Sequence, residues 1–294
     1  SPPKIPPNST LKFDVEVLGW KGEDLSPKKD ESIVRFIIES GEGYSTPNDG
    51  ARVEVHLEGK YNDTVFDDRD VWFTLGEGSE ANVIDGIEKA VEKFKKGEKS
   101  KLIIKSKYAF GKEGNKEFNI PPDATVEYTV TLTAFEKLKE SWSLDSAEKI
   151  EQAKIFKEKG TNYYKDGKFS LAIKLYKKIL TYLDADSNQS DEKKSLKLSA
   201  NLNLSLCYFK LGEHFDVRQT ATAAIELDPK NVKAYFRRGQ ALVALGEPEL
   251  ASKDFATVLD IEPNNAAAKA QQALCAKVLK QQLQKEKKDL RKYV

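Results

Sequence analysis

The sequence has little of the chemistry on which many enzymes and metal sites depend. It contains no methionine, two cysteines and two histidines among 294 residues. The histidines, His56 and His214, lie far apart and have no Cys or carboxylate cluster at ligand spacing, so we expect no metal site. The cysteines, Cys207 and Cys275, fall in helical patterns with apolar neighbours, which favours reduced, buried thiols over a disulfide.

Long apolar runs and an excess of one charge are also absent. No run approaches the ~18 residues that span a membrane, and no apolar signal-peptide core opens the chain. The 48 Lys and Arg residues balance 47 Asp and Glu residues, which leaves a net charge of +1. We therefore expect neither nucleic acid nor membrane as a partner. We expect a cytoplasmic protein, with the nucleus as a second candidate compartment.

Sequence motifs for common enzyme classes are missing as well. No nucleophile elbow occurs, and no Gly-rich loop is followed by a helix in the register that cradles phosphates. We therefore expect no cofactor, and hydrolase or kinase chemistry is excluded. The length favours about two domains.

A 34-residue period organises the second half of the chain. Gly212 and Gly246 are 34 residues apart, and so are Pro229 and Pro263. This period is the signature of the tetratricopeptide repeat, a pair of antiparallel helices. We predict three repeats over residues 149–265, in register from Ala153, Leu198 and Val232.

Three positions within each repeat support this register. A large residue is expected at the eleventh position, a small one at the twentieth and a second large one at the twenty-fourth. The eleventh position holds Tyr163, Tyr208 and Leu242 in the three repeats. The twentieth holds Ala172, Val217 and Ala251, and the twenty-fourth holds Tyr176, Ala221 and Phe255. The second repeat is the least faithful. Stacked repeats of this kind form a concave groove that binds peptides.

The first half has a different character. Val53–Leu57 and Val126–Leu132 alternate apolar and polar residues, as half-buried strands do. Residues 33–38 and 101–105 read as further strands, and a short helix is expected from an N-cap at Asp85 to Phe94. The prediction is an α+β domain over residues 31–139, an antiparallel sheet around one short helix, followed by a linker at 140–148.

The start of the chain repeats part of the sequence of this domain. Residues 5–15 parallel residues 120–130 at a constant offset of 115. We therefore expect residues 1–18 to be the last strand of a truncated upstream copy of the domain, poorly anchored here, and residues 19–30 to be a linker.

Four motifs in this half resemble those of the FKBP-type peptidyl-prolyl isomerases. They are Phe66-Asp67, Val83-Ile84-Asp85-Gly86, Tyr108-Ala109-Phe110-Gly111 and Ile120-Pro121-Pro122. Together with the repeats, the whole chain resembles the large immunophilin co-chaperones, which carry two FKBP domains in tandem. The resemblance implies a fragment that lacks the first of these domains.

The resemblance also implies a proline-binding pocket, and this sequence departs from its pattern. Where the family has a Trp on the short helix and a Tyr before the last strand, this chain has Ile87 and Phe110. Leu57 and Val71 replace two further aromatic residues. The residues that follow the pattern are Phe66, Asp67, Val83, Ile84 and Tyr128. We expect a degenerate pocket with little or no isomerase activity. The alternatives are an active isomerase that assists protein folding, and residues that merely fill a core.

The repeats resemble those that clamp the acidic tails of chaperones. Lys157, Asn203, Lys233 and Arg237 match the family's carboxylate clamp, and Thr161 stands where an Asn is frequent. We expect the Thr161 hydroxyl to donate to the ligand in its place. The implied partner is the Glu-Glu-Val-Asp tail of heat shock protein 90, with heat shock protein 70 as a second candidate, along with client proteins. The alternative is an ordinary solvated surface.

The last segment, residues 266–294, reads as a capping helix that extends past the repeats. Ala273, Ala276, Leu279 and Leu283 are spaced to cover the last repeat. From Asn265 onward the chain has eight Lys and Arg residues and two acidic residues. This composition makes calmodulin a candidate partner, and the alternative is a solvated helix end.

Overall fold

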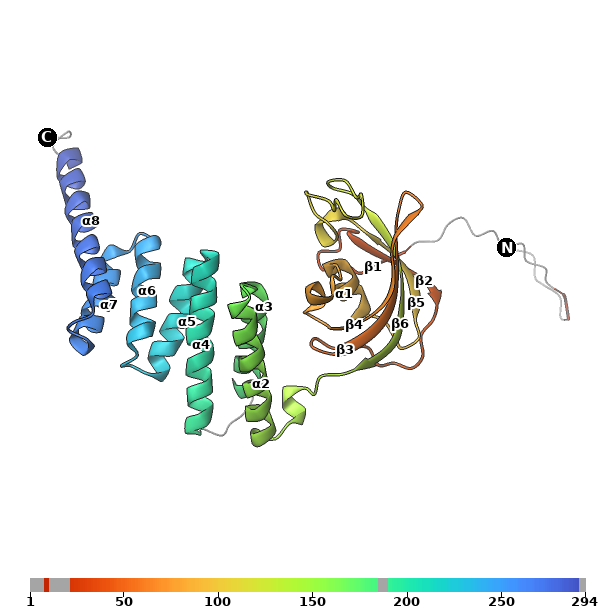
Figure 1. Ribbon diagram of the computed structural model, residues 1–294, viewed down its shortest axis with the longest axis horizontal. Helices are drawn as coiled ribbons and strands as arrows, with labels where there is room; N and C mark the ends of the chain where they lie inside the picture. Colours follow the sequence, from red (N-terminus) through yellow and green to blue (C-terminus); the bar gives the residue numbers. More distant parts are fainter. Residues whose placement is uncertain (1–7, 11–21, 185–189, 291–294) are drawn as a thin grey trace. The chain divides into compact units, whose positions relative to one another are not determined.

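A computed structural model describes residues 8–10, 22–184 and 190–290 of the chain, the last six without their side chains. The chain divides into two compact units, one up to Leu138 and one from Lys139 (Figure 1). The segment expected to be the last strand of an upstream domain, residues 1–18, lies outside the described residues except for 8–10.

The first unit is a six-stranded antiparallel sheet in the order β1-β2-β5-β6-β3-β4. Figure 1 shows the strands curving around the short helix α1. The strands are β1 (Glu23–Asp24), β2 (Ile33–Glu39), β3 (Arg52–Tyr61), β4 (Thr64–Thr74), β5 (Lys99–Ile104) and β6 (Val126–Glu136). The helical segments are η1 (Gly78–Ala81), α1 (Asp85–Val91) and η2 (Ser106–Tyr108). The predicted α+β fold is confirmed.

Alternation along the two central strands builds the core of this unit. The apolar side chains of β3 and β6 that face α1 are buried, while their neighbours in sequence are more exposed. Register places Val55 opposite Leu132 and Leu57 opposite Val130, so that both pairs lie on the inner face. The side chain of Ile87 on α1 is fully buried against this face.

The start of α1 differs from the prediction. Ile84, in an extended conformation, occupies the N-cap position, and Asp85 is the first helical residue. Asp85 and Glu88 then place negative charge in the first turn, where the helix dipole favours it. The Glu88 carboxylate also accepts the backbone N–H of Gly76 at 2.6 Å, which ties the helix to the turn after β4.

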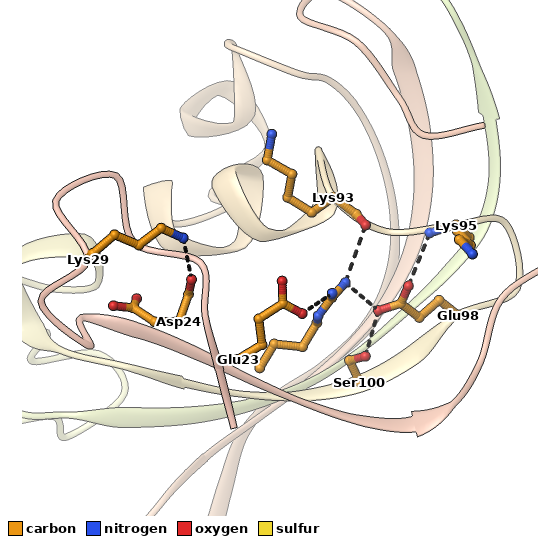
Figure 2. A network of polar contacts seen from close by, with 8 residues as sticks. Glu23, Asp24, Lys29, Lys93, Lys95, Glu98 and Ser100 are labelled. Atoms are coloured by element: carbon orange, nitrogen blue, oxygen red, sulfur yellow. Dashed lines mark hydrogen bonds and ion pairs between the residues drawn. The ribbon is translucent and has the colours of Figure 1, made fainter. Parts of the chain in front are cut away.

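Part of the expected linker at residues 19–30 belongs to the sheet, because β1 pairs with β2. Figure 2 shows the polar network at this edge, with Glu23, Lys93 and Glu98 labelled. Arg35 of β2 forms ion pairs with both of these glutamates. Its guanidinium contacts Glu23 of β1 and donates to Glu98 at 3.1 Å and to the Lys93 carbonyl at 3.3 Å. Ser100 donates to the same Glu98 carboxylate at 2.7 Å. One buried cation therefore joins the entering chain to both the sheet and the segment after α1.

The second unit consists of helices. They are η3 (Ser141–Ser143), α2 (Ser146–Lys165), α3 (Phe169–Asp184), α4 (Asp191–Leu211), α5 (His214–Leu227), α6 (Val232–Ala244), α7 (Pro248–Ile261) and α8 (Ala266–Leu290). Helices α2 and α3, α4 and α5, and α6 and α7 pack as pairs, as the three repeats require (Figure 1). Among the described residues no helix is long and apolar enough to cross a membrane. The predicted repeat fold is confirmed.

A capping box starts α2 inside the segment expected to be a linker. The Glu148 backbone N–H donates to the Asp145 carboxylate at 2.8 Å, and the Asp145 N–H donates to the Glu148 carboxylate at 3.1 Å. This reciprocal pair satisfies two backbone donors and begins the helix at Ser146.

Glycine within two of the helices permits close packing inside a repeat. The ring of Tyr176 on α3 lies against Gly160 on α2, where a Cβ atom would come within 2.9 Å of the ring. Phe255 on α7 packs in the same way against Gly239 on α6, at 2.8 Å. The aromatic side chain of the second helix therefore fills the space that the missing Cβ atom leaves on the first.

The buried face of α8 differs from the predicted one. Cys275 is buried against Leu242, Ala251 and Phe255, and Ala268 is buried one heptad earlier. Of the predicted stripe, Leu279 is half-buried, whereas Ala273, Ala276 and Leu283 are exposed. Alanines occur around most of this helix, so their spacing does not define a face. The stripe prediction was wrong.

The Gly239→Ala variant should be less stable than the wild type, although alanine stabilises a helix interior by about 1 kcal/mol relative to glycine. Overpacking against Phe255 should lower the free energy of unfolding by about 1–3 kcal/mol. Chemical denaturation of the variant, alone and combined with Phe255→Leu, measures this effect. The smaller side chain should recover part of the loss, and a Gly239→Ala variant more stable than the wild type would contradict the packing described here.

Candidate functional site

The predicted pocket of the first unit is a cavity of about 570 Å³ beside the start of α1. Asp67, Val83, Ile84 and Phe110 line this cavity, as do polar residues that the sequence analysis did not single out. The other members of the predicted set lie elsewhere. Leu57, Ile87 and Tyr128 are buried in the core, and Val71 and Phe66 are partly buried against it.

Four aromatic rings meet at the edge of this cavity. The Phe66 ring centre lies 5.3 Å from Phe118, 5.5 Å from Tyr128 and 6.0 Å from Phe110. Phe118 sits on a turn whose base is closed by two backbone hydrogen bonds between Asn115 and Ile120, each 2.8 Å. Phe118 packs against Phe66 and therefore covers part of that aromatic surface. The sequence analysis missed Phe118, since a single aromatic residue in a polar loop carries no periodic signal.

Two polar residues of this pocket, Asp67 and Arg69, are hydrogen-bonded to each other and to neighbouring groups. Asp67 accepts from Arg69 Nε at 2.9 Å and from the Tyr128 hydroxyl at 3.3 Å. Arg69 also donates to the carbonyls of Ala81 and Asn82, both at 2.9 Å. Burial and the neighbouring Asp67 carboxylate raise the pKa of Tyr128 far above neutrality. The Tyr128 hydroxyl therefore stays protonated and donates within the fold.

The predicted clamp residues of the second unit lie on the first helix of each repeat. Lys157 and Thr161 are on α2, Asn203 is on α4, and Lys233 and Arg237 are on α6. These three helices pack in the order α2, α4, α6. The structure thus places the clamp residues along one row of neighbouring helices.

Two hollows lie along this row, and α4 contributes to both. One, of about 570 Å³, is lined by Lys157 and Thr161 together with Leu196 of α4. The other, of about 610 Å³, is lined by Lys233 and Arg237 together with Leu202 of α4. We refer to this row, with its two hollows, as the α2–α4–α6 groove.

The Thr161 hydroxyl is used within α2. Its Oγ1 donates to the Lys157 carbonyl, four residues earlier, at 2.8 Å. Thr and Ser commonly form this backbone bond inside helices. The single hydroxyl hydrogen that we expected to serve a ligand is therefore already committed.

Arg237 and Arg238 are neighbours on α6 with opposite electrostatic environments. Arg238 makes a two-bond ion pair with the buried Asp254 carboxylate, at 2.7 and 2.8 Å, and this pair raises its pKa. Arg237 instead donates to two neutral acceptors, the Leu202 carbonyl and, at 3.3 Å, the Ser205 hydroxyl. Burial lowers the pKa of Arg237, since no carboxylate offsets its desolvation. One arginine is compensated within the fold and the other is not.

Asp228 and Glu262 line the same hollow as Arg237, but in the described part of the chain neither carboxylate forms an ion pair with it. Cys207 lies close to it, but burial raises the pKa of that thiol to about 11, so it is neutral at pH 7. In the part of the chain that the structure describes, Lys157, Lys233 and Arg237 form no ion pair with a carboxylate. The groove therefore presents three cations that are free to bind an anion. No group of His, Cys, Asp and Glu side chains in the described residues is suited to hold a metal ion.

Comparison with known proteins gives two family matches. Residues 43–133 match the FKBP-type peptidyl-prolyl cis-trans isomerases, and residues 220–251 match the tetratricopeptide repeat. FK506-binding protein 59 of Drosophila melanogaster is 47% identical over 288 residues, which cover 98% of this chain and 66% of that protein. The chain belongs to the FKBP-type immunophilins with tetratricopeptide repeats.

Human peptidyl-prolyl cis-trans isomerase FKBP4 is also 47% identical to this immunophilin, over 292 residues that cover 98% of this chain and 64% of that protein. The chain thus spans just under two thirds of the length of these relatives.

Solved structures match parts of the immunophilin chain. The C-terminal repeat domain of a Plasmodium falciparum FK506-binding protein covers 49% of this chain and 99% of its own, with 27% identity and a TM-score of 0.47. The first repeat domain of Spaghetti (RPAP3), solved with the HSP90 peptide SRMEEVD, covers 44% and 94%, with 33% identity and a TM-score of 0.37.

The two arginines of this immunophilin should differ in their contribution to stability. Arg238→Ala leaves the buried Asp254 carboxylate unpaired and should lower the free energy of unfolding by about 2–4 kcal/mol. Arg237→Ala removes a charge that the fold does not compensate, so it should cost at most about 1 kcal/mol. Chemical denaturation of both variants compares the two costs directly. Equal losses would mean that Arg237 has a structural countercharge and is not held for a ligand.

Proposed function

We propose that this immunophilin is a co-chaperone that binds the Glu-Glu-Val-Asp tail of heat shock protein 90 in its α2–α4–α6 groove. The observation that carries the proposal is the half-buried Arg237 guanidinium, which has neutral partners only. Its desolvation is unfavourable in the free protein and is recovered when a carboxylate enters the groove.

The geometry favours a ligand with more than one carboxylate. Lys233 and Arg237 are four residues apart on α6 and line the same hollow. Lys157 lines the hollow between α2 and α4. An extended peptide with acidic side chains and a terminal carboxylate can reach cations in both hollows, whereas a single small anion can fill only one. Arg can bind a carboxylate through two parallel bonds, and Lys acts as a point charge.

The groove is also selective for a short peptide over a polyanion. The hollow beside Arg237 contains the apolar side chains of Leu202 and Phe236, which suit an aliphatic residue such as the ligand valine. Asp228 and Glu262 line the same hollow, so a ligand there must place its carboxylates beside Lys233 and Arg237 and away from these two acids. With a net charge of +1, no wider field attracts nucleic acid.

We further propose that the FKBP-type unit contributes little or no isomerase activity in this chain. An isomerase lowers a barrier of about 18–20 kcal/mol by favouring a twisted prolyl amide. Here Ile87 is fully buried in place of an aromatic floor, and the Tyr128 hydroxyl donates to Asp67. Phe118 also packs on Phe66 and covers part of the aromatic surface that a prolyl ring could use. The alternative is an active isomerase.

The proposal also covers the cellular compartment and two further partners, client proteins and calmodulin. Because the proposed partner is a cytosolic chaperone, we expect the protein in the cytoplasm, where client proteins would reach it through the chaperone. For calmodulin the relevant element is α8, where Leu274 and Leu283 are 44% and 56% exposed among lysines. An amphipathic basic helix is a known target type for calmodulin.

Replacing either cation on α6 should weaken peptide binding. Lys233→Ala and Arg237→Ala should each cost about 1.5–3 kcal/mol of binding free energy, because each removes a charge-assisted bond. Isothermal titration calorimetry with a Glu-Glu-Val-Asp peptide measures the loss. Lys253→Ala on α7 is the matched control, since it removes the same charge from the second helix of the repeat and should leave affinity unchanged.

Equal affinity in the wild type and in both α6 variants would contradict the proposal that Lys233 and Arg237 bind the peptide. Equal losses in all three variants would show a diffuse electrostatic attraction and no defined site.

The wild-type chain should catalyse prolyl isomerisation at a rate close to the uncatalysed one. A protease-coupled assay with a proline-containing peptide measures this rate, with circular dichroism as the control for folding. A rate well above background would show that the pocket opens to substrate despite Phe118, and the alternative function would then stand.

A further inference from the structure

We propose that the buried hydroxyl of Ser205 on α4 is a positioning group for the peptide site. It holds one nitrogen of the Arg237 guanidinium, so that the opposite edge of the guanidinium, Nε and Nη2, is presented to a ligand carboxylate. This inference rests on the proposed function, because it names a residue that orients a cation of the same groove without touching the ligand.

The contacts of Arg237 use one of its three guanidinium nitrogens. Nη1 donates to the Leu202 carbonyl and, at 3.3 Å, to the Ser205 hydroxyl, so both of its hydrogens are used. Among the described residues Nε and Nη2 have no hydrogen-bond acceptor, and neither is sealed from solvent. Arg237 and Leu202 line the hollow of about 610 Å³. The two unused nitrogens form the edge through which an arginine can bind a carboxylate with two parallel bonds.

The Ser205 hydroxyl is arranged to accept a hydrogen bond from Arg237. It donates its one hydrogen to the Leu202 carbonyl at 2.7 Å, which leaves its oxygen as an acceptor. Ser205 is fully buried, so a ligand cannot reach it directly. The hydroxyl and the Leu202 carbonyl together fix Nη1 to α4. An effect of Ser205 on the ligand therefore passes through Arg237.

Arg238 shows the complete arrangement on the same helix. Its Nη1 donates at 3.3 Å to the Thr222 hydroxyl, which in turn donates to the Arg218 carbonyl of its own helix at 2.8 Å. Its Nε and Nη2 bind the two carboxylate oxygens of Asp254 at 2.8 and 2.7 Å. Arg237 has the hydroxyl on Nη1 but no carboxylate on the other edge. The missing carboxylate is the part that a ligand would supply.

The second repeat differs from its neighbours at the position of Ser205. The corresponding residues of the first and third repeats are Gly160 and Gly239, each packed against an aromatic ring of the second helix. In the second repeat Ala221 takes the place of that ring, and this smaller side chain leaves space for one at position 205. The hydroxyl thus occurs on the helix that Arg237 faces.

The test compares two hydroxyls that bond to neighbouring arginines. Ser205→Ala removes the hydroxyl beside Arg237, and Thr222→Val is the matched control, because it removes the same kind of bond from Arg238. Both variants should lose a little stability. Ser205→Ala alone should weaken binding of a Glu-Glu-Val-Asp peptide, by roughly 3–10-fold, as expected for one hydrogen bond. Equal losses of affinity in the two variants would overturn the inference.

Two further measurements separate positioning from a general structural effect. In the free protein, NMR of the arginine side chains reports the rate of rotation about the Nε–Cζ bond, which Ser205→Ala should increase for Arg237 and leave unchanged for Arg238. In an Arg237→Ala background, Ser205→Ala should cause no further loss of affinity, since the group that it positions is gone. An unchanged rotation rate, or an equal loss of affinity in both backgrounds, would overturn the inference.

The outcomes also separate this inference from the function on which it rests. If the wild type binds the peptide and Ser205→Ala binds equally well, the inference is overturned and the proposed function stands. If the wild type does not bind the peptide at all, both are overturned.

Discussion

Arg237 holds a half-buried guanidinium between α4 and α6, and the partners that it finds in the fold are neutral. The adjacent Arg238 shows that the same helix can compensate an arginine fully, through the Asp254 carboxylate. The difference lies in the direction of the two side chains, because consecutive helical residues point about 100° apart. Arg238 faces the second helix of its own repeat, whereas Arg237 faces the first helix of the preceding one. The uncompensated cation is thus kept where a ligand can reach it.

The repeat packing determines where this cation and its companions lie. Gly160 and Gly239 allow the aromatic rings of Tyr176 and Phe255 to pack closely between the helices of a repeat. The first helices of the three repeats lie in one row, which places Lys157 and Arg237 along the same groove.

Much of this could be predicted from the sequence, because it depends on periodic patterns. The 34-residue spacing of Gly212 and Gly246 indicated the repeats, and the alternation in β3 and β6 indicated the sheet. Features that depend on single side chains could not be predicted. The Arg35 network depends on partners that are far apart in the sequence. The position of Phe118 depends on the conformation of a loop turn. The Thr161 hydroxyl could have bonded either the backbone or a ligand, and the sequence does not show which. The face of α8 was misjudged because alanine fits both buried and exposed positions.

The central claim is that the groove recognises the carboxylate at a chain end. Calorimetry with a Glu-Glu-Val-Asp peptide as the free acid and as the C-terminal amide tests it most directly, since the two ligands differ in that group alone. The account predicts that the amide binds at least about 10-fold more weakly, the loss of about 1.4 kcal/mol expected for one charge-assisted contact. Equal affinities for the two peptides would contradict it.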